Sequence, residues 1–599
     1  MEAPFYSKQN LRFTLRDIVN VSALLDTPHF GMHSLESIDM ILDAADALSE
    51  QHLRPILKEM DSTPPHLENG VVKVHPAMRG LMKKFGEDGW ISLSAPIEHG
   101  GQQAPFTVLQ AAAFIMAAAN YSTMAYPFLT NGAAHLIESF GSKELQQVFV
   151  PRMYAGEWQG TMALTEPQAG SSLSDITTSA TSTPEGHYLI KGQKVFISCG
   201  DHNACDNVVH LMLARIHGAP EGTKGISLFV VPKFRISEGI LIANDVNTAG
   251  VFHKMGYHGA PITHLIMGEN SDCHGYLVGE PHKGLSYMFQ MMNEARVGVG
   301  LQATSIATAA YYNSLTYSRE RTQGRRPGEK NPSTEQIAII EHADVRRLLL
   351  FQKAIVEGSL SLCLQCTMYL DLSKCDSDSD KEKYYLLAEI LTPIAKSYPA
   401  EMSILSTSAA LQCFGGYGYT KEYLAELYFR ETRIHTLHEG TTAIHGMDLL
   451  GRKITMKGGA AVATLLTEIN MCIEEAAQNP ITAKAAEDLK TCILKLQKTT
   501  GLLLQLAQEK GAENYLANAS VYLEAFGIVT IAWQWLKQAN IANRLIAENK
   551  KQYNSDFLQS KIKTMEYFFG YELPKLNGLL NTLNNRQELL LNFKSAELL

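Results

Sequence analysis

One short stretch of the chain, residues 434–449, combines residue types that could do chemistry. Its sequence, IHTLHEGTTAIHGMDL, places an acid, Glu439, directly before Gly440 and two threonines. The histidines that stand around this acid are His435, His438 and His445. Three kinds of site could use such a pattern: a metal centre, a turn that caps a helix, or a carboxylate base held at a helix end.

The metal and capping alternatives account for only part of the pattern. HEGTT differs from the zinc motif HExxH because Thr442 stands where the second histidine would be. No cysteine pair and no second carboxylate cluster lies near it in the sequence, so we predict no metal. A cap is the better of these two alternatives, since Gly440 and Thr441 could end one helix and start another. Capping does not explain the preceding acid.

A catalytic base would explain both the acid and the glycine. Ile434 and Leu437 are apolar neighbours of Glu439, and a carboxylate that loses hydration has a raised pKa and becomes a better base near neutral pH. Gly440 allows the chain to bend closely around a ligand. We therefore interpret the break in this apolar run as room for a substrate beside the base.

The elements that must position these residues follow from the periodicity of the sequence. Apolar residues recur at helical spacing over 35–159, short β-rich runs with turn clusters follow over 160–280, and helical patterns return over 281–455 and 456–599. Residues 1–34 form an N-terminal extension. We predict an α+β multidomain protein with an N-terminal helical domain, a middle antiparallel β domain, a helical bundle domain and an extra C-terminal helical domain.

The bulk properties exclude several classes of protein. A chain of 599 residues suggests three or four domains, and 45% hydrophobic with 19% charged residues is typical of a soluble globular protein. The net charge of −9 gives no electrostatic reason to expect nucleic acid. We find no apolar run that would cross a bilayer and expect no membrane partner. Nine scattered cysteines and the absence of a secretory signal pattern predict a cytoplasmic location.

Several motifs, taken together and in order, carry a family resemblance. HEGTTAIH resembles the YEGT-type motif of acyl-CoA dehydrogenases, and the segments over 160–175 (GTMALTEPQAGSSLSD) and 191–215 (KGQKVFISCG and onward) resemble two further signatures of that family. Later blocks over 293–303, 318–324 and 411–423 match as well. The resemblance covers about 34–453, and the length and C-terminal extension are similar to the branch that includes the 3-methylmercaptopropionyl-CoA dehydrogenases.

The resemblance implies an activity. Members of the family use FAD to oxidise an acyl-CoA thioester to a trans-2-enoyl-CoA, with Glu439 at the position of the base that removes the α-proton. Some branches place the base immediately before the residue that matches Arg296, but Ala295 stands there in this chain. The resemblance also implies an electron-transfer flavoprotein as electron acceptor. Alternatives are an acyl-CoA oxidase that uses O2, or a catalytically silent, DNA-binding member of the superfamily.

The resemblance also implies which residues contact the ligands. Phe196, Ile197 and Ser198 stand where the family has Trp-Ile-Thr against the flavin, and Arg321 and Gln412 stand where a neighbouring subunit holds the nucleotide end of FAD. A homodimer or higher homo-oligomer is therefore expected. The full set of expected cofactor residues is Met162, Leu164, Thr165, Gly170, Ser171, Phe196, Ile197, Ser198, Arg321, Gln412, Gly415, Gly416 and Thr441. The expected substrate residues are Ser171, Asn293, Arg296 and Gly440.

Overall fold

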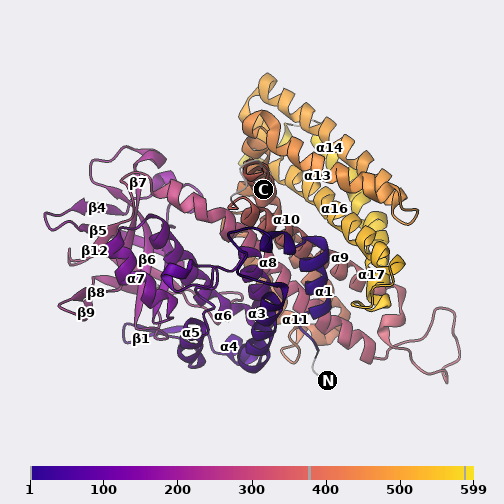
Figure 1. The fold of residues 1–599 in the computed structure, drawn as a ribbon, viewed down its shortest axis with the longest axis horizontal. Helices are drawn as coiled ribbons and strands as arrows, with labels where there is room; N and C mark the ends of the chain where they lie inside the picture. Colours follow the sequence, from indigo (N-terminus) through magenta and orange to yellow (C-terminus); the bar gives the residue numbers. More distant parts are fainter. Residues whose placement is uncertain (1–2, 376–379, 586–587, 599) are drawn as a thin grey trace. The chain divides into compact units, whose positions relative to one another are not determined.

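The chain forms two compact units of different composition. The computed structural model describes residues 3–375, 380–585 and 588–598 (Figure 1). One unit is Ile38–Ala295, called here the β-containing unit, and the other joins Met1–Ser37 to Arg296–Leu599 and is called the helical unit. The fold class expected from the sequence is confirmed: helices come first, a β domain follows, and helices fill the rest of the chain.

The β-containing unit begins with helices. Their bounds are α3 Leu35–Leu48, α4 Leu57–Ser62, α5 Ala77–Glu87, α6 Phe106–Phe140 and α7 Lys143–Tyr154. A small hairpin interrupts this otherwise helical region, with β1 His66–Glu68 paired antiparallel to β2 Val71–Lys73. This hairpin is not predicted from the sequence, because each strand has only three residues. Asn69 and Gly70 both have positive φ at its turn, and Asn-Gly is the pair that such a turn favours.

Helix α6 is kinked at Asn120, where two helical segments meet. It runs through 35 residues with one non-helical position, Asn120, at φ −162° and ψ 95°. The amide of Asn120 donates to the Leu53 carbonyl at 3.0 Å, so the break is bonded to the preceding segment. The side chains of α6 are almost all buried, because alanines and larger apolar residues cover every face of the helix.

Two helices contradict the expectation that no apolar run could cross a bilayer. By length and hydropathy, α6 and α9 (Ala343–Leu372) could both span one. In the structure, the most apolar stretch of α6 is 100% buried and that of α9 is 78% buried. Protein side chains therefore surround most of their apolar surface, as in core helices.

An eight-stranded sheet forms the core of the β-containing unit. Its strands are β3 Trp158–Ala163, β4 Ser179–Ser182, β5 Tyr188–Ser198, β6 Asn207–Ile216, β7 Ile226–Pro232, β10 Val246–Val251, β11 Ile262–Met267 and β12 His274–Leu277. The order is β10-β11-β5-β12-β7-β6-β3, with β4 paired to both β5 and β6. The pairs β3·β6 and β4·β6 are parallel and the others are antiparallel, so the sheet is mixed where the sequence predicted an antiparallel one. Ile190, Phe229 and Leu265 pack in its core.

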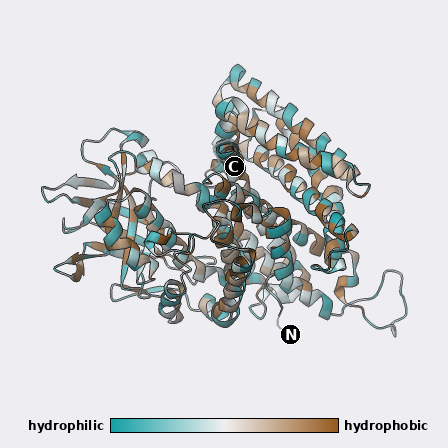
Figure 2. Ribbon diagram, in the orientation of Figure 1, coloured by the Kyte–Doolittle hydropathy of each residue, from teal (hydrophilic) through white to brown (hydrophobic). Residues whose placement is uncertain are grey.

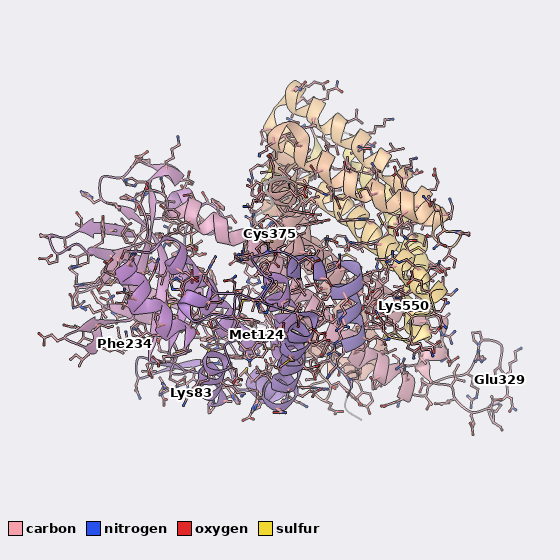
Figure 3. All side chains as sticks on the ribbon, viewed as in Figure 1. Lys83, Met124, Phe234, Glu329, Cys375 and Lys550 are labelled. Atoms are coloured by element: carbon pink, nitrogen blue, oxygen red, sulfur yellow. The ribbon has the colours of Figure 1, made fainter. Side chains whose placement is uncertain are left out.

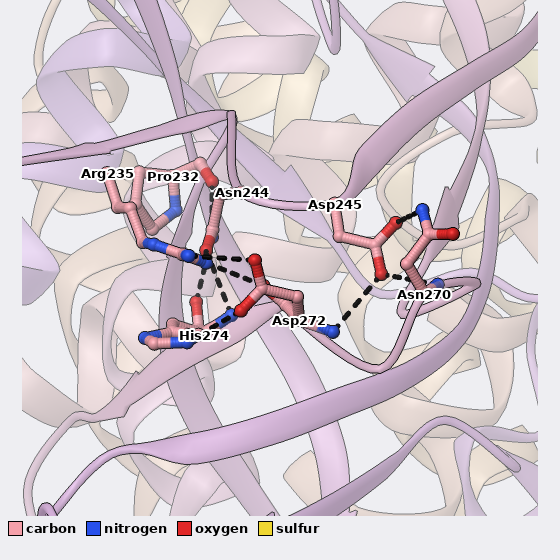
Figure 4. A network of polar contacts seen from close by, with 7 residues as sticks. All are labelled: Pro232, Arg235, Asn244, Asp245, Asn270, Asp272 and His274. Atoms are coloured by element: carbon pink, nitrogen blue, oxygen red, sulfur yellow. Dashed lines mark hydrogen bonds and ion pairs between the residues drawn. The ribbon is translucent and has the colours of Figure 1, made fainter. Parts of the chain in front are cut away.

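A polar network ties a separate hairpin to this sheet (Figure 4). The hairpin consists of β8 Phe234–Ser237 and β9 Ile240–Ala243. Arg235 donates to the carboxylate of Asp272 at 2.8 Å and to its carbonyl at 2.7 Å. The Asn244 side chain accepts from the His274 amide at 2.9 Å and donates to the His274 carbonyl at 2.9 Å. The start of β12 is therefore fixed to both ends of the hairpin.

The helical unit is built on three long helices. These are α8 Gly284–Glu320, whose first residues belong to the β-containing unit, α9 Ala343–Leu372 and α10 Lys381–Phe414. Tyr311, Leu349 and Val356 pack in the core between α8 and α9. The loop over 322–338 extends from the helices it joins, and Figure 3 marks Glu329 on it. Arg325 stabilises this loop by donating a hydrogen bond to the Thr334 carbonyl at 2.5 Å.

Further helices complete this unit. Their bounds are α11 Ala425–Thr432, α12 Thr442–Asp448, α13 Ala460–Ala477, α14 Ala483–Lys510, α15 Ala512–Leu516, α16 Ala519–Ala547, α17 Ser555–Tyr567, α18 Leu576–Asn584 and α19 Leu589–Asn592. The hydrophilic and hydrophobic residues of α13 and α14 lie on different faces, as Figure 2 shows. Their apolar faces supply buried residues such as Leu465 and Leu489 to the core.

The N-terminal extension is part of the helical unit. It contains α1 Lys8–Phe13 and α2 Ser22–Leu25. Phe13 meets the rings of Tyr553 and Phe557 edge-on at 5.4 and 5.5 Å. Lys561 of α17 is fully buried, forms an ion pair with Glu357 of α9 at 2.8 Å and also donates to Asn10 of α1. One buried cation thus joins the extension, the bundle and the C-terminal helices.

Candidate active site

Glu439 lies in a tight turn between two short helical segments. A 3-10 turn ends at Thr436, and α12 begins at Thr442 with Thr441 as its N-cap residue. Glu439 has φ 53° and Gly440 has φ 87°, so two consecutive residues adopt the left-handed conformation. This conformation costs a non-glycine residue about 1 kcal/mol or more, and such strain is characteristic of functional sites. The capping alternative describes the helix start, but the Thr441 side chain makes no capping bond.

Side chains from two helices hold the carbonyl groups of this turn. The fully buried Lys396 of α10 donates its Nζ to the Gly440 carbonyl at 2.7 Å. The buried His445 of α12 lies with Nε2 2.9 Å from the Glu439 carbonyl. Because a carbonyl can only accept, His445 must carry its proton on Nε2.

The electrostatic surroundings of Glu439 suit a base. Burial raises its pKa above the ordinary value, and the positive charges of Arg296 and Lys396 counteract part of that increase. Arg296 is itself buried and forms an ion pair with Asp448 at 3.2 Å. A carboxylate whose pKa is raised by burial is a stronger base than a solvated one, because its charged form is disfavoured.

The three histidines around Glu439 are uncharged. Burial lowers the pKa of His435 and His445 to about 3 and that of His438 well below its ordinary value, so all three are neutral at pH 7. His435 and His438 meet edge to face, with ring centroids 5.3 Å apart. Among the described residues, no group of three or more His, Cys, Asp and Glu side chains could hold a metal ion.

In the β-containing unit, a buried ion pair fixes the loop that follows β3. Lys194 of β5 contacts Glu166 at 2.8 Å and also donates to the Leu164 carbonyl at 3.0 Å. Thr177 and Thr178 donate their backbone amides to the same carboxylate at 2.6 and 3.0 Å. Burial alone would raise the pKa of Glu166, but the Lys194 charge and these hydrogen bonds bring it down to about 2. The loop is therefore held from both sides.

This loop and the end of β5 expose groups that could hold a planar ring. Phe196 is 62% exposed, has φ 59° and stacks on Phe252 with centroids 4.5 Å apart. The Val195 amide donates to the Thr165 carbonyl at 2.9 Å, so Thr165 lies beside this strand end. The hydroxyls of Thr165 and Ser198 make no hydrogen bond within the part of the chain that the structure describes.

The remaining expected residues of this unit are placed as follows. Met162 on β3 and Leu164 after it are half-buried, whereas the side chain of Ile197 is buried in the sheet. Gly170 and Ser171 are exposed on the loop. Asn293 lies half-buried on α8 and belongs to the β-containing unit, whereas Arg296, Gly440 and Thr441 belong to the helical unit.

The residues expected at the nucleotide end of FAD gather at one end of the bundle. Arg321 follows α8 directly and Gln412 lies in the last turn of α10, where Tyr317 stacks on Phe414 at 4.4 Å. Arg321, Gln412, Gly415 and Gly416 are all exposed. Lys396, beside Glu439, precedes Gln412 by 16 residues of α10, which corresponds to about 24 Å of helix. Within one chain, the base and these residues are therefore far apart.

Two contacts at the site escaped the sequence analysis. Lys396 contacts the turn across 44 residues of sequence, and Asp448 pairs with Arg296 across 152. The one available signal was a lone lysine in an otherwise apolar helical run, ILTPIAKSYPA. For Arg296, no local signal in the sequence identifies Asp448 of α12 as its ion-pair partner.

Comparison with known proteins gives consistent matches along the chain. Four family models match in order: acyl-CoA dehydrogenase, N-terminal domain, at 36–157; acyl-CoA dehydrogenase, middle domain, at 161–269; acyl-CoA dehydrogenase, C-terminal domain, at 282–454; and acetyl-CoA dehydrogenase C-terminal like at 465–594.

Individual relatives match over most of their length. The chain is 36% identical to the 3-methylmercaptopropionyl-CoA dehydrogenase of Ruegeria pomeroyi over 88% of this chain and 90% of that protein. It is 32% identical to a butyryl-CoA dehydrogenase of Syntrophomonas wolfei over 96% of each. Among solved structures, Caenorhabditis elegans ACDH-11 in complex with C11-CoA superposes with a TM-score of 0.74 at 19% identity, covering 99% of this chain and 97% of that one. That likeness shows a shared fold over the whole length.

Proposed function

The chain belongs to the acyl-CoA dehydrogenase family, and from this premise we propose that it oxidises an acyl-CoA thioester to the trans-2-enoyl-CoA with FAD as cofactor. Glu439 is the base that removes the α-proton. The observation that carries this proposal is the partly buried carboxylate, held in a left-handed turn with its pKa raised by burial and moderated by two cations.

The β-containing unit offers groups that fit the flavin ring of FAD. Phe196 presents an exposed aromatic face, and Thr165 and Ser198 offer hydroxyls that make no hydrogen bond to any residue the structure describes. A Cβ added at Gly170 would meet no atom within 4 Å, so the loop leaves space beside its backbone. Met162 and Leu164 supply half-buried apolar contacts at the same strand end. When bound, FAD supplies a hydride acceptor for the β-carbon.

Residues of this chain would accept the proton and hold the reacting groups in place. Glu439 takes the α-proton, and its neighbours Lys396 and His445 keep the turn in place while the proton moves. Burial excludes water, which strengthens every electrostatic interaction at the reacting carbon. The proton ends on the Glu439 carboxylate, and the two electrons leave with the hydride, so the thioester gains a C=C bond and loses two hydrogens.

The proposal includes a homo-oligomer in which each FAD contacts two chains. Arg321 has no ion pair within the described part of the chain, and an exposed guanidinium can bind two oxygens of a pyrophosphate at once. Gln412 lies about 24 Å along α10 from Lys396, and Arg321 follows α8 where Tyr317 stacks on Phe414 at the same end of α10. Both are therefore better suited to a cofactor shared with a second copy. Electron-transfer flavoprotein is the electron acceptor that we propose.

Anaerobic reduction of the bound flavin tests the proposal. The purified holoenzyme is mixed with butyryl-CoA, longer straight-chain and branched acyl-CoAs, and 3-methylmercaptopropionyl-CoA. We expect at least one of them to remove the absorbance of oxidised flavin and to yield one equivalent of enoyl-CoA. A flavin-loaded protein that no member of the panel reduces would overturn the proposed activity. In air, stoichiometric peroxide would instead support an oxidase.

A further inference from the structure

Four lysines are fully buried in the described part of the chain, and one of them differs from the other three. Lys194, Lys453 and Lys561 each form an ion pair with a carboxylate, which belongs to Glu166, Glu389 and Glu357 respectively. Lys396 forms no ion pair within 4.0 Å in that part of the chain, and its hydrogen bond goes to a backbone carbonyl. A buried cation without a paired carboxylate is costly, so its retention calls for a role.

The surroundings of Lys396 point to the turn that carries the base. Desolvation lowers its pKa to about 8, and the opposing negative charges are those of Glu439 and Glu401. Arg296 is the cation that faces it. The other titratable groups around it are the neutral His435, His438 and His445 and the ion-paired Asp448. Glu439 is therefore the acid that gains most from the charge of Lys396.

Two adjacent carbonyls in this turn are each held by one side chain. His445 holds the carbonyl of Glu439, and Lys396 holds that of Gly440. A third contact strengthens the same junction, because Thr442 at the start of α12 donates its hydroxyl to Glu401 of α10 at 2.5 Å. The left-handed conformation of Glu439 is thus maintained from α10 and α12 together, and loss of either bond would let the turn relax.

We propose that Lys396 is a positioning residue for Glu439: its ammonium group fixes the turn through the Gly440 carbonyl, and its charge favours the ionised carboxylate. This inference rests on the proposed function for the role of Glu439. Two variants separate the two effects. Lys396→Met removes both the hydrogen bond and the charge, whereas Lys396→Gln keeps a donor and removes only the charge. Lys453→Met is the matched control, since Lys453 is equally buried but pairs with Glu389.

Hydrogen–deuterium exchange tests the hold on the turn without any need for activity. In Lys396→Met, we expect amides in the peptide over 437–442 to exchange at least about tenfold faster than in the wild type, because the Gly440 carbonyl has lost its partner. Lys396→Gln should exchange more slowly than Lys396→Met, and Lys453→Met should match the wild type there. Equal exchange in all four proteins, or equal acceleration in Lys453→Met, would overturn the positioning role.

The pH profile of flavin reduction tests the charge. Without the Lys396 charge, Glu439 should ionise at higher pH, so the acidic limb of the rate profile should move up by about one pH unit in both Lys396 variants. Lys453→Met should leave that limb in place. If the acidic limb of Lys396→Gln stays at the wild-type pH, the proposed effect of the Lys396 charge on Glu439 is contradicted. If Lys396→Met does not fold, the pH profile of Lys396→Gln still tests whether the Lys396 charge favours the ionised carboxylate. If no acyl-CoA reduces the wild-type flavin, the proposed function fails, while the exchange measurement still tests the turn.

Discussion

Replacing Lys561 by methionine should destabilise the helical unit strongly. The Lys561 ammonium group supplies hydrogen bonds to Glu357, Asn10 and Gln538, all buried. Methionine fills similar space but leaves these three acceptors without that donor, and each such loss costs about 1–3 kcal/mol. Lys353 still compensates the charge of Glu357. Breaking a buried ion pair costs about 3–5 kcal/mol, so we expect the free energy of unfolding to fall by about 3–5 kcal/mol.

The aromatic surroundings make this loss larger than that of a plain ion pair. Lys561 Nζ lies 5.1 Å from the ring centroid of Phe557, 5.3 Å from that of Phe13 and 5.6 Å from that of Trp535. A desolvated cation–π contact contributes about 0.5–2 kcal/mol. These contacts connect α1, α16 and α17, so their loss should loosen the N-terminal extension together with the C-terminal helices.

Urea unfolding followed by tryptophan fluorescence measures this change. Two of the four tryptophans, Trp533 and Trp535, lie buried in α16, and the ring of Trp535 lies beside Lys561. Lys563→Met is the control on the same helix, because Lys563 is 70% exposed and pairs only with Glu566. That variant should differ from the wild type by less than about 0.5 kcal/mol. A Lys561→Met protein within about 1 kcal/mol of the wild type would refute the reasoning.

The pH dependence supplies a second check with a defined sign. Desolvation lowers the pKa of Lys561 to about 8, and Glu357 opposes this decrease. Between pH 8 and the ordinary lysine pKa, the unfolded chain then binds more protons than the folded chain, so wild-type stability rises with pH there. The advantage of the wild type over Lys561→Met should widen across that window. If this difference in the free energy of unfolding narrowed with pH instead, the surroundings of Lys561 would favour its charged form in the folded chain, which would contradict the lowered pKa.

Three further predictions concern the site. Gly440→Ala should slow flavin reduction at least about 100-fold, because φ is 87° and the new Cβ would lie 2.9 Å from His445 Nε2; stopped-flow absorbance measures it. Arg321→Met should weaken FAD binding about 10- to 100-fold in reconstitution titrations, while Arg347→Met, which removes an exposed ion pair, should not. The Glu166 carboxylate has a pKa of about 2 in the folded chain, so the stability that it contributes above pH 4.5 is lost as pH falls toward 2. The thermal unfolding temperature of the wild type should therefore depend on pH in this range more than that of the double variant Glu166→Gln, Lys194→Met.

Much of the fold follows from periodicity in the sequence. The long apolar patterns predicted α6, α8, α9 and α10, and the short β-rich runs predicted the sheet. Periodicity did not reveal the β1–β2 hairpin, since three-residue strands are shorter than any window in which alternation can be recognised. It also did not locate the kink at Asn120 that divides α6 into two helical segments, because the apolar pattern continues through that position.

Some residues of the site can be predicted from their sequence neighbours, whereas others are brought to the site from distant parts of the chain. Glu439 and Gly440 were predicted from adjacent residue types, and their left-handed conformation fits a glycine-assisted turn. The partners Lys396 and Asp448 come from distant segments, and no local pattern tells which lysine or aspartate in a helix will face the turn. Arg321 and Gln412 come together only because the ends of α8 and α10 pack through Tyr317 and Phe414.

The most direct test of the central claim is single-turnover flavin reduction by a Glu439→Gln variant. Glutamine has nearly the same shape but cannot accept the α-proton, so this protein should retain FAD and bind acyl-CoA while flavin reduction slows by several orders of magnitude. Glu426→Gln, which removes a carboxylate paired with Arg430 away from the turn, should reduce its flavin at the wild-type rate. A Glu439→Gln protein that reduces its flavin within about tenfold of the wild type would show that another group is the base.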